Sequence, residues 1–475
     1  MILVAGCGYL GARIAGLLHD AGHQIVGLTH SPDSAAKLAT SVPWKVEACD
    51  ISDKNAVAAL ASKLGASDVT ALIHCASSGR GGADAYRRVY LDGMGNLMAA
   101  FASARPVFTS STSVYPQVDG SIVDESSEAN PDKETGHLLR QTEELVLASK
   151  GIVARLAGIY GPGRSFVLRN LLEGKAAIEG GDGHGRILNQ IHRDDAASAI
   201  VHLLAQPGGG LFNIVDDAPM TQRECLERLA ARFGTDMPPV TPPNPDRKRG
   251  WTSKRVSNAK LRATGWKPRF PSYFDALDGD AELASSILGQ IESESPGVLP
   301  RRKNVVLIGL MGSGKSTVGR MVAAKLGFQF VDTDHLIVET AKRTIPQIFE
   351  QEGEAAFRLR ESAALRSLLN REHCVIATGG GIVTQERNHP LLRHLGFIVW
   401  LDADVATLHR RTAGSHDRPL LKDDDPKAKL QRLLDARRPL YKQLSDLRII
   451  TDELSQDETA YGLAESARVF LGGRH

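Results

Sequence analysis

One stretch of the sequence, residues 305–320, constrains the fold of this chain more than any other. It reads VVLIGLMGSGKSTVGR, in which a short apolar run precedes the phosphate-loop pattern of a glycine, four residues and then Gly-Lys-Ser. The glycines let the backbone curl so that several N–H groups point at one phosphate, and the helix that begins near Lys315 adds its positive end. The Lys315 ammonium can reach the β- and γ-phosphates, and the Ser316 hydroxyl can ligate Mg²⁺.

A glycine-rich turn in front of an ordinary helix is the alternative interpretation of this stretch. The apolar strand before the loop and the amphipathic helix after it disfavour that alternative, because the pattern fixes many positions at once. The sequence therefore predicts a nucleoside triphosphate site. The residues expected to contact ATP there are Gly312, Ser313, Gly314, Lys315, Ser316 and Thr317.

The chain has 475 residues, which is too many for one ordinary domain. Its first part alternates short apolar runs with helical patterns, and this alternation predicts a parallel sheet with helices on both faces. A polar segment that contains prolines and a glycine separates this part from a second α/β pattern. The predicted boundaries are 1–290 for the first domain, 291–302 for the linker and 303–475 for the second domain. The strands expected in the first domain are 2–5, 24–28, 45–48, 70–74, 106–110, 152–156 and 211–214.

Composition excludes several classes of function. Apolar residues make up 42% of the chain and charged residues 24%, as in soluble proteins with large cores, and a net charge of +2 gives no case for a nucleic-acid or membrane surface. Five scattered cysteines without a CxxC pair indicate reduced thiols, with neither disulfides nor a zinc site. The opening MILVAG predicts a strand and no signal peptide, and no apolar stretch is long enough to span a bilayer. These features predict a cytoplasmic protein.

Two carboxylates follow the next predicted strand, in Asp332-Thr333-Asp334. They come at the carboxyl end of a parallel strand beside the phosphate loop, which is where ligands bind in open α/β sheets. Because alternate residues of an extended segment point the same way, both carboxylates can face the site. One can hold Mg²⁺ through water, and the other can accept a hydrogen bond from a substrate hydroxyl. A pair of helix caps before Leu336 is the alternative.

A run of three glycines and a polar loop add to this pattern. Gly379-Gly380-Gly381 follows a buried apolar run and leaves backbone N–H groups able to meet an anion or a compact ligand. The polar loop at 412–425 carries Arg418 and is a candidate lid near the phosphates.

Taken in order, GLMGSGKSTVGR, DTD, FRLRE, GGG, RTAGSHDRPLL and RRPLY closely resemble the shikimate kinase family over about residues 303–472. The resemblance implies a P-loop fold of the nucleoside monophosphate kinase type and the transfer of phosphate from ATP to shikimate, giving shikimate 3-phosphate for chorismate and aromatic amino acid biosynthesis. A related kinase for gluconate or another sugar acid is the alternative, since gluconate also carries a carboxylate and hydroxyls. An ATP-binding switch without catalysis is disfavoured, because no catalytic position that can be named is missing.

The same resemblance implies roles for the residues that would meet shikimate. Arg358 and Arg437 would hold the carboxylate, a task suited to guanidinium groups, and Gly380 would add a backbone N–H. Asp334 would hold the ring hydroxyls and take the proton from the attacking 3-hydroxyl.

The other roles concern the nucleotide. Asp332 and Ser316 would lie on the Mg²⁺ side. Lys315 and Arg418 of the lid would stabilise charge on the transferred phosphoryl group, and Arg411 would stack on the adenine. Each arginine taken alone could be a solvated surface charge, but the complete set disfavours that alternative.

The first domain opens with a dinucleotide-binding fingerprint. A glycine-rich segment follows the first strand and begins a helix, and the residues expected to contact the cofactor are Gly6, Gly8, Tyr9, Leu10 and Gly11. The acidic residue usual at the end of the second strand is absent, since Thr29-His30-Ser31 stands there, so the motif is compatible with NADP as well as NAD. Asp50 at the end of the third strand can meet the adenine edge or cap a turn.

Further motifs, SSTSVY at 110–115, IYGPG at 159–163 and IHRDD at 191–195, resemble the extended short-chain dehydrogenase/reductase family, which includes nucleotide-sugar epimerases, over about residues 1–280. Ser111 sits where that family places a catalytic serine or threonine. The family also uses a Tyr-x-x-x-Lys pair, but the corresponding positions here are Thr135 and Leu139, which cannot transfer the proton.

The first domain is therefore expected to bind NAD or NADP without the usual tyrosine-dependent chemistry. Two alternatives remain, a scaffold with an empty cofactor cleft and an active enzyme with a relocated acid, for which His137 is the nearest candidate. The resemblance also implies pairing into a homodimer through helices of this domain.

Overall fold

The computed structural model describes residues 1–79, 81–180, 184–244, 250–413 and 425–472. These residues form two compact units. The first unit comprises Met1–Gly161, Ala177–Cys225 and Pro239–Ala276, and the second comprises Pro162–Ala176, Leu226–Pro238 and Leu277–His475.

The first unit is built on a seven-stranded, fully parallel sheet with the strand order β12-β7-β5-β4-β1-β2-β3. All seven predicted strands are present in it with boundaries that shift by one residue or less, which confirms the prediction of a doubly wound sheet. Their bounds are β1 (Ile2–Ala5), β2 (Ile25–Thr29), β3 (Lys45–Ala48), β4 (Ala71–His74), β5 (Arg105–Ser111), β7 (Ile152–Leu156) and β12 (Gly210–Ile214).

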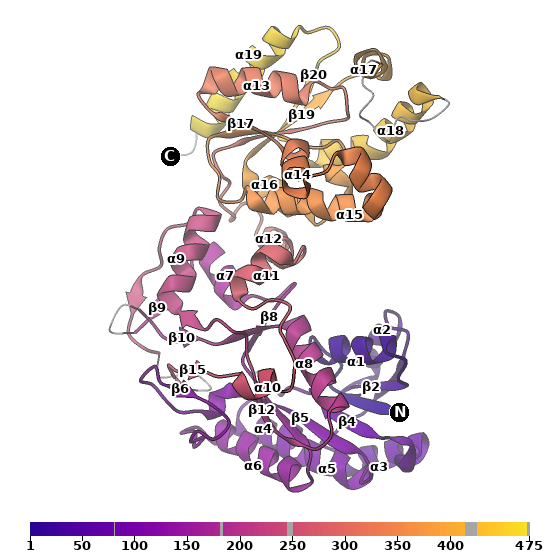
Figure 1. The fold of residues 1–475 in the computed structure, drawn as a ribbon, viewed down its shortest axis with the longest axis vertical. Helices are drawn as coiled ribbons and strands as arrows, with labels where there is room; N and C mark the ends of the chain where they lie inside the picture. Colours follow the sequence, from indigo (N-terminus) through magenta and orange to yellow (C-terminus); the bar gives the residue numbers. More distant parts are fainter. Residues whose placement is uncertain (80, 181–183, 245–249, 414–424, 473–475) are drawn as a thin grey trace. The chain divides into compact units, whose positions relative to one another are not determined.

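Helices cover both faces of this sheet, as a parallel sheet requires. Figure 1 shows α1 (Gly11–Asp20), α2 (Pro32–Ala39) and α8 (Arg193–Ala205) on one face, and α3 (Lys54–Leu64), α5 (Gly93–Ala100) and α6 (Glu134–Ala148) on the other. The central strands β1, β4 and β7 are buried along their whole length, so the core lies against both faces of the sheet. The remaining strands form two-stranded pairs: β6 (Ile122–Val123) with β15 (Arg255–Val256), β8 (Gly158–Tyr160) with β11 (Gln190–His192), β9 (Ile178–Glu179) with β14 (Val240–Thr241), and β10 (Ile187–Leu188) with β13 (Met220–Thr221).

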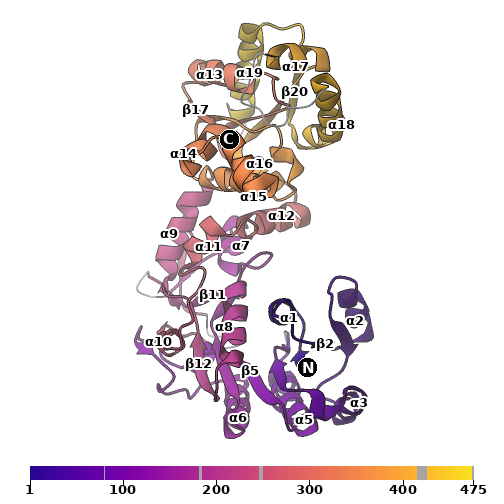
Figure 2. The ribbon, with the colours of Figure 1, turned by 45° about the vertical axis from the view of Figure 1, so that its right-hand side comes forward.

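The second unit contains a five-stranded parallel sheet with the order β17-β18-β16-β19-β20. Its strands are β16 (Val305–Ile308), β17 (Gln329–Asp332), β18 (Cys374–Ala377), β19 (Phe397–Asp402) and β20 (Leu447–Ile450). In Figures 1 and 2, α13 (Lys315–Leu326) and α19 (Gln456–Gly472) lie together on one face, and α14 (Thr333–Ala341), α15 (Ile345–Ser367) and α16 (Asn388–Leu395) lie on the other. The carboxyl ends of β16, β17 and β18 meet at one edge of the sheet, which places the glycine loop and the paired carboxylates together.

The exact domain boundaries stay a prediction. Residues 291–294 form the end of α12 (Leu283–Glu294), and 295–304 contain neither helix nor strand. Within the described part of the chain, none of the helices combines the length and the apolar character needed to cross a membrane.

Candidate active site

A cavity of about 620 Å³ lies at the carboxyl edge of the five-stranded sheet. It is lined by the phosphate loop, by both carboxylates after β17, by the glycines after β18, and by arginines from three helices. The predicted site residues on its wall are Gly312, Ser313, Gly314, Lys315, Ser316, Thr317, Asp332, Asp334, Arg358, Gly380, Arg411 and Arg437. The structure thus brings together every kinase residue singled out in the sequence except Arg418, which lies outside the described residues.

The phosphate loop joins β16 to α13 through glycines that no other residue could replace without strain. Gly309 has a φ of +142°, and a Cβ at this position would lie 2.4 Å from the carbonyl oxygen of Leu401. Gly314 caps α13 with a φ of +96°, so the first helical N–H groups open toward the cavity. Lys315 is 8% exposed, and its Nζ donates to the carbonyl oxygens of Gly309 at 2.8 Å and of Leu310 at 2.9 Å. The ammonium is held by the loop that it serves.

The two carboxylates after β17 have different surroundings. Asp332 accepts a hydrogen bond from Ser316 Oγ at 2.7 Å and one from the backbone N–H of Asp334 at 3.0 Å. It therefore caps α14, which is the role named as the alternative, and it also touches the hydroxyl of the phosphate loop, while its role on the Mg²⁺ side stays a prediction. Asp334 lies in the first turn of α14 and lines the cavity. A Cβ at Gly379 would lie 2.8 Å from Asp334 Oδ1, so the glycine makes room for this carboxylate.

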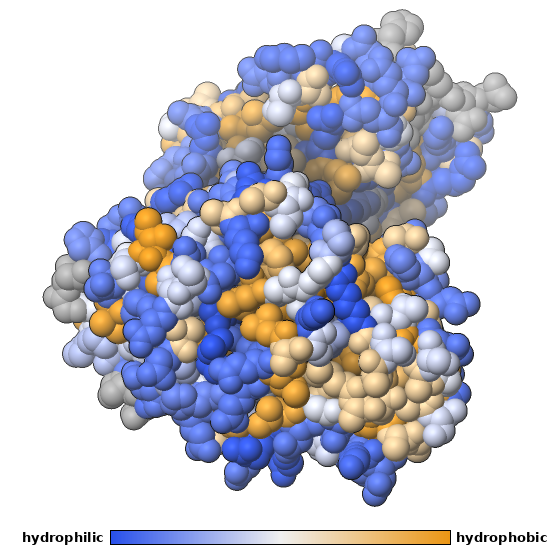
Figure 3. Space-filling model, turned by 60° about the horizontal axis from the view of Figure 1, so that its bottom comes forward, coloured by the Kyte–Doolittle hydropathy of each residue, from blue (hydrophilic) through white to orange (hydrophobic). Residues whose placement is uncertain are grey.

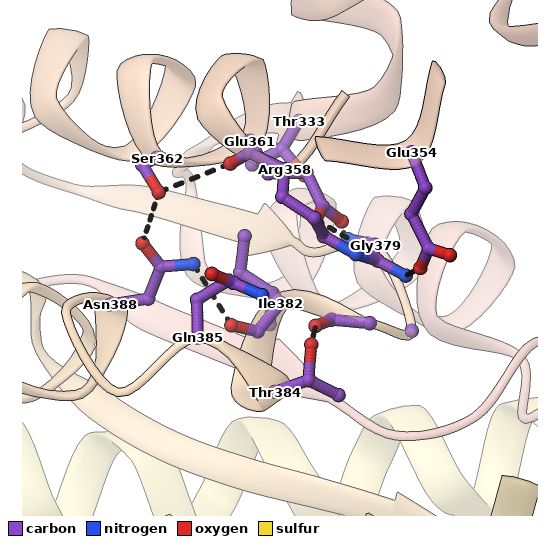
Figure 4. Close-up of polar contacts among 12 residues, drawn as sticks. Thr333, Glu354, Arg358, Glu361, Ser362, Gly379, Ile382, Thr384, Gln385 and Asn388 are labelled. Carbon is purple, nitrogen blue, oxygen red and sulfur yellow. Dashed lines mark hydrogen bonds and ion pairs between the residues drawn. The ribbon is translucent and has the colours of Figure 1, made fainter. Parts of the chain in front are cut away.

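The Arg358 guanidinium is bound by two carboxylates (Figure 4). Its Nη1 donates to Glu361 Oε2 and its Nη2 to Glu354 Oε1, both at 2.7 Å. The side chains of Arg358 and Glu361 are 7% and 1% exposed, whereas that of Glu354 is 58% exposed. Burial of Glu361, only partly offset by Arg358, raises the pKa of this carboxyl to about 7.

Glu361 is a site residue to which the sequence analysis assigned no role, although it stands in the FRLRE motif. It lines the cavity, and a Cβ at Gly379 would lie 2.7 Å from its Oε1. The available signal was its spacing, because residues three apart on a helix are neighbours, which places Glu361 against Arg358.

Arg437 and Arg411 approach the cavity from α18 (Pro426–Leu444) and α17 (Val405–Thr412). Arg437 Nη1 donates to the carbonyl oxygen of Gly380 at 3.0 Å, and Tyr441 Oη donates to the same oxygen at 2.5 Å. These two contacts fix the middle glycine of the triplet through its carbonyl group, so its expected N–H contact with substrate stays a prediction. Arg411 donates to Thr451 Oγ1 at 3.0 Å and to its carbonyl oxygen at 2.8 Å.

The close contact of Gly381 with Arg358 gives a first prediction. A Cβ at Gly381 would lie 2.1 Å from Arg358 Nη1 and 2.6 Å from Cζ, so Gly381→Ala must displace the guanidinium. Because a hydrogen bond to a charged group contributes about 1.5–3 kcal/mol, we expect the KM for the acceptor substrate to rise at least about tenfold. Steady-state kinetics measure this change. Gly462→Ala is the matched control. A Cβ added there would meet nothing within 4 Å, so this substitution should leave KM unchanged.

In the first unit, the fingerprint glycines form a second candidate site after β1. Gly6 has a φ of +89°, and a Cβ there would lie 2.3 Å from the backbone nitrogen of Ala76. A Cβ at Gly8, in contrast, would meet nothing within 4 Å, so open space lies in front of this residue. The Leu10 side chain is buried, which leaves only its backbone able to face a ligand, and the Tyr9 ring lies 5.1 Å from the Arg193 guanidinium.

The two other predicted cofactor contacts lie after β3 and at the end of β5. Asp50 Oδ1 accepts from Ser52 N at 3.0 Å and from Ser52 Oγ at 2.7 Å, which is the turn-capping role named as the alternative. Both hydrogen bonds use Oδ1, so the other carboxylate oxygen, Oδ2, can still meet a ligand. Ser111 is buried and its Oγ accepts from the backbone N–H of Ser113.

Helix α6 carries the positions where a tyrosine and lysine would be expected. Its register is fixed by buried Glu143, which accepts from Ser110 Oγ at 2.5 Å and ion-pairs with buried Arg155 at 2.6 Å. Leu139 is buried and His137 is exposed on this helix. The sequence of α6 contains neither tyrosine nor lysine, so the helix supplies no such pair.

Both parts of the chain match families of known proteins. The shikimate kinase family model matches residues 311–468, and the NAD dependent epimerase/dehydratase family model matches residues 2–214. A shikimate kinase of Symbiobacterium thermophilum is 46% identical over 164 residues, which are 34% of this chain and 94% of that protein. One of Trichormus variabilis is 51% identical over 146 residues, which are 31% of this chain and 80% of that protein.

A structural likeness accompanies the match of the first unit. The UDP-glucose 4-epimerase of Thermus thermophilus in complex with NAD has a TM-score of 0.50 and 21% identity, and the alignment covers 61% of this chain and 99% of that one. At this identity the likeness shows the fold alone.

A phosphate loop on a parallel sheet, with carboxylates and arginines around one cavity, defines a P-loop small-molecule kinase. Through this segment the chain belongs to the shikimate kinase family, and it joins the kinase to an epimerase/dehydratase-like Rossmann unit. The predictions of this fusion and of its fold class are confirmed.

Proposed function

We propose that residues 303–475 transfer the γ-phosphate of ATP to the 3-hydroxyl of shikimate. The observation that carries this proposal is a shared cavity. The phosphate loop, Asp334, Arg358 and Arg437 all line it. A small hydroxy acid can meet guanidinium groups with its carboxylate and a carboxylate base with its hydroxyl only where both kinds of group surround one space.

Each residue then has a task that its position supports. Arg358 and Arg437, with the backbone of Gly380, hold the shikimate carboxylate. Asp334 orients the ring hydroxyls and accepts the proton of the attacking one. Lys315 stabilises the charge that develops on the transferred phosphoryl group.

The nucleotide lies along the glycine loop, between 312 and 317, with its phosphates over the start of α13 and its adenine beside Arg411. Arg418 of the lid is proposed to add a second positive charge at the phosphoryl group. Ser316 and Asp332 fit a Mg²⁺ site, since their oxygens lie 2.7 Å apart beside the phosphate loop and oxygen ligands suit this ion. When bound, Mg²⁺ would neutralise phosphate charge and orient the β- and γ-phosphates.

Release of ADP by the full chain tests this function. We expect turnover that requires ATP, Mg²⁺ and shikimate, with little or none on quinate or gluconate. Turnover on gluconate but not on shikimate would favour the alternative sugar-acid kinase, and the absence of turnover on all three would refute the assignment.

For the first unit we propose binding of a nicotinamide dinucleotide without tyrosine-dependent chemistry. The open space in front of Gly8 and the helix α1 that begins after it suit a pyrophosphate, which needs close backbone approach and a helix end. The composition of α6 supports the second half of the proposal. Asp50 and Ser111 would lie at the adenine and nicotinamide ends of the cofactor.

Substitution at Gly8 tests this binding. The Gly8→Asp side chain would enter the open space and repel the pyrophosphate, so we expect the saturable fluorescence change on NADPH or NADH titration to be lost. Because a Cβ there touches no protein atom, the thermal unfolding midpoint and the kinase activity of the same chain should not change. A wild-type chain without any saturable signal would support the scaffold alternative.

We also propose a cytoplasmic location and a homodimer formed through helices of the first unit. All five cysteines are free thiols, as expected in a reducing compartment. Figure 3 shows apolar residues gathered across the middle of the face turned toward the viewer, with hydrophilic residues around and between them. Sedimentation of the full chain measures the oligomeric state, and a concentration-independent monomer would refute the dimer.

A further inference from the structure

Arg358 is already occupied before any substrate arrives. Its two terminal nitrogens each donate to a glutamate, Glu361 and Glu354, at 2.7 Å (Figure 4). The two glutamates differ in the solvent exposure of their side chains. The Glu361 side chain is 1% exposed and is enclosed by the site, whereas the Glu354 side chain is 58% exposed and can leave.

The carboxylate of a substrate would compete with Glu354 for this guanidinium. Two carboxylates that share one site repel each other, and bidentate binding of a third carboxylate needs N–H groups on the same fork. Gly381 covers the guanidinium from one side, since a Cβ there would lie within 2.8 Å of Nη1, Cζ and Nη2. The incoming carboxylate therefore cannot use that side, and Nη2 is the terminal nitrogen whose present partner, Glu354, is exposed.

The backbone at Glu354 suits a partner that moves. Helix α15 is interrupted at Gly353, which has a φ of +81° and a ψ of 172°, so Glu354 begins a new helical segment. A Cβ at Gly353 would meet nothing within 4 Å, so there is open space on that side of the kink. The Glu354 side chain is exposed, and its carboxylate pairs with Arg358.

We propose that Glu354 is an internal competitor for the acceptor carboxylate, which binds Arg358 in the empty enzyme and gives it up when substrate binds. The contact keeps the guanidinium oriented and lowers the apparent affinity for anionic substrates. This inference rests on the proposed assignment of Arg358 to the shikimate carboxylate.

Glu354→Gln tests the competition because glutamine keeps the shape and removes the charge. Only the Glu354 end of this ion pair is exposed, and such pairs contribute little net free energy, so we expect the KM for shikimate in the full chain to fall by up to about fivefold, with kcat changed less than about twofold. Glu350→Gln, an exposed glutamate one turn earlier in α15, is the matched control and should leave KM unchanged. An unchanged or raised KM in Glu354→Gln would overturn the proposal and show that Glu354 only orients Arg358.

A second measurement isolates the carboxylate. Calorimetric titration should show tighter binding of shikimate to Glu354→Gln, but equal binding of the uncharged shikimate carboxamide to the variant and the wild type. An equal gain for both ligands would overturn the inference. These outcomes differ from failure of the proposed function, in which the wild-type chain would not phosphorylate shikimate at all.

Discussion

Replacement of Lys315 with alanine is expected to lower kcat by a factor of about 100 or more. The Lys315 ammonium lies inside the phosphate loop, 8% exposed and bonded to the carbonyl oxygens of Gly309 and Leu310. It is therefore held within the loop that is proposed to carry the phosphates, close to where charge would develop on the transferred group. A factor of 100 corresponds to about 2.7 kcal/mol of lost transition-state stabilisation. Initial rates at saturating ATP, Mg²⁺ and shikimate measure the loss.

The KM for shikimate should change much less in Lys315→Ala, because Arg358 and Arg437 remain in place to hold the acceptor. Lys325→Ala is the control. This lysine is exposed in the last turn of the same helix, so its substitution removes the same charge away from the site. A variant that retained its kcat but needed far more shikimate would show that Lys315 binds the acceptor, contrary to the role proposed here.

The sequence predicted the fold of this chain well because parallel sheets bury their strands on both faces. Runs such as Ile2–Ala5 and Val305–Ile308 are apolar without interruption, and each became a buried central strand. Strand β20 was not predicted. Its sequence LRII is short, and its residues alternate between intermediate burial and exposure, as on a sheet edge with one covered face.

The candidate site was predicted to the extent that its residues stand in motifs. The glycine loop and the paired aspartates follow strands directly, so the parallel topology alone brings them to one edge. For Arg358, helical spacing places two carboxylates beside it, but that spacing does not show which of the two is enclosed. Which carboxylate is enclosed and which is exposed depends on how α15 kinks at Gly353 and packs over the glycines after β18, and the packing has no local sequence signal.

Asp332 makes two contacts that the sequence could not predict together. The motif predicted either a helix cap or a metal ligand at Asp332, yet one oxygen caps α14 while the other accepts the hydrogen bond of the Ser316 hydroxyl. A carboxylate has two oxygens, and alternatives that use different ones do not exclude each other.

Asp334→Asn is expected to lower kcat by a factor of about 100 to 10,000, the range typical of a lost general base. The amide keeps the size of the carboxylate, which matters because Gly379 leaves room for little more: a Cβ on that glycine would already lie 2.8 Å from Asp334 Oδ1. The substitution thus removes the ability to accept the hydroxyl proton with little change in packing. Rapid-quench measurement of a single turnover isolates the chemical step from product release.

The neighbouring Asp332→Asn provides the contrast that makes this test specific. Asp332 contacts Ser316 on the proposed Mg²⁺ side, so its loss should raise the Mg²⁺ concentration needed for half-maximal rate, and saturating Mg²⁺ should restore part of the activity. No Mg²⁺ concentration should restore Asp334→Asn, because the group proposed to be missing is a proton acceptor and not a metal ligand. If Asp334→Asn instead raised the KM for shikimate and left the single-turnover rate intact, Asp334 would bind the ring hydroxyls only. The attacking hydroxyl would then lose its proton elsewhere, as a loose phosphoryl-transfer transition state permits, since such a state demands little nucleophile activation before the phosphoryl group departs.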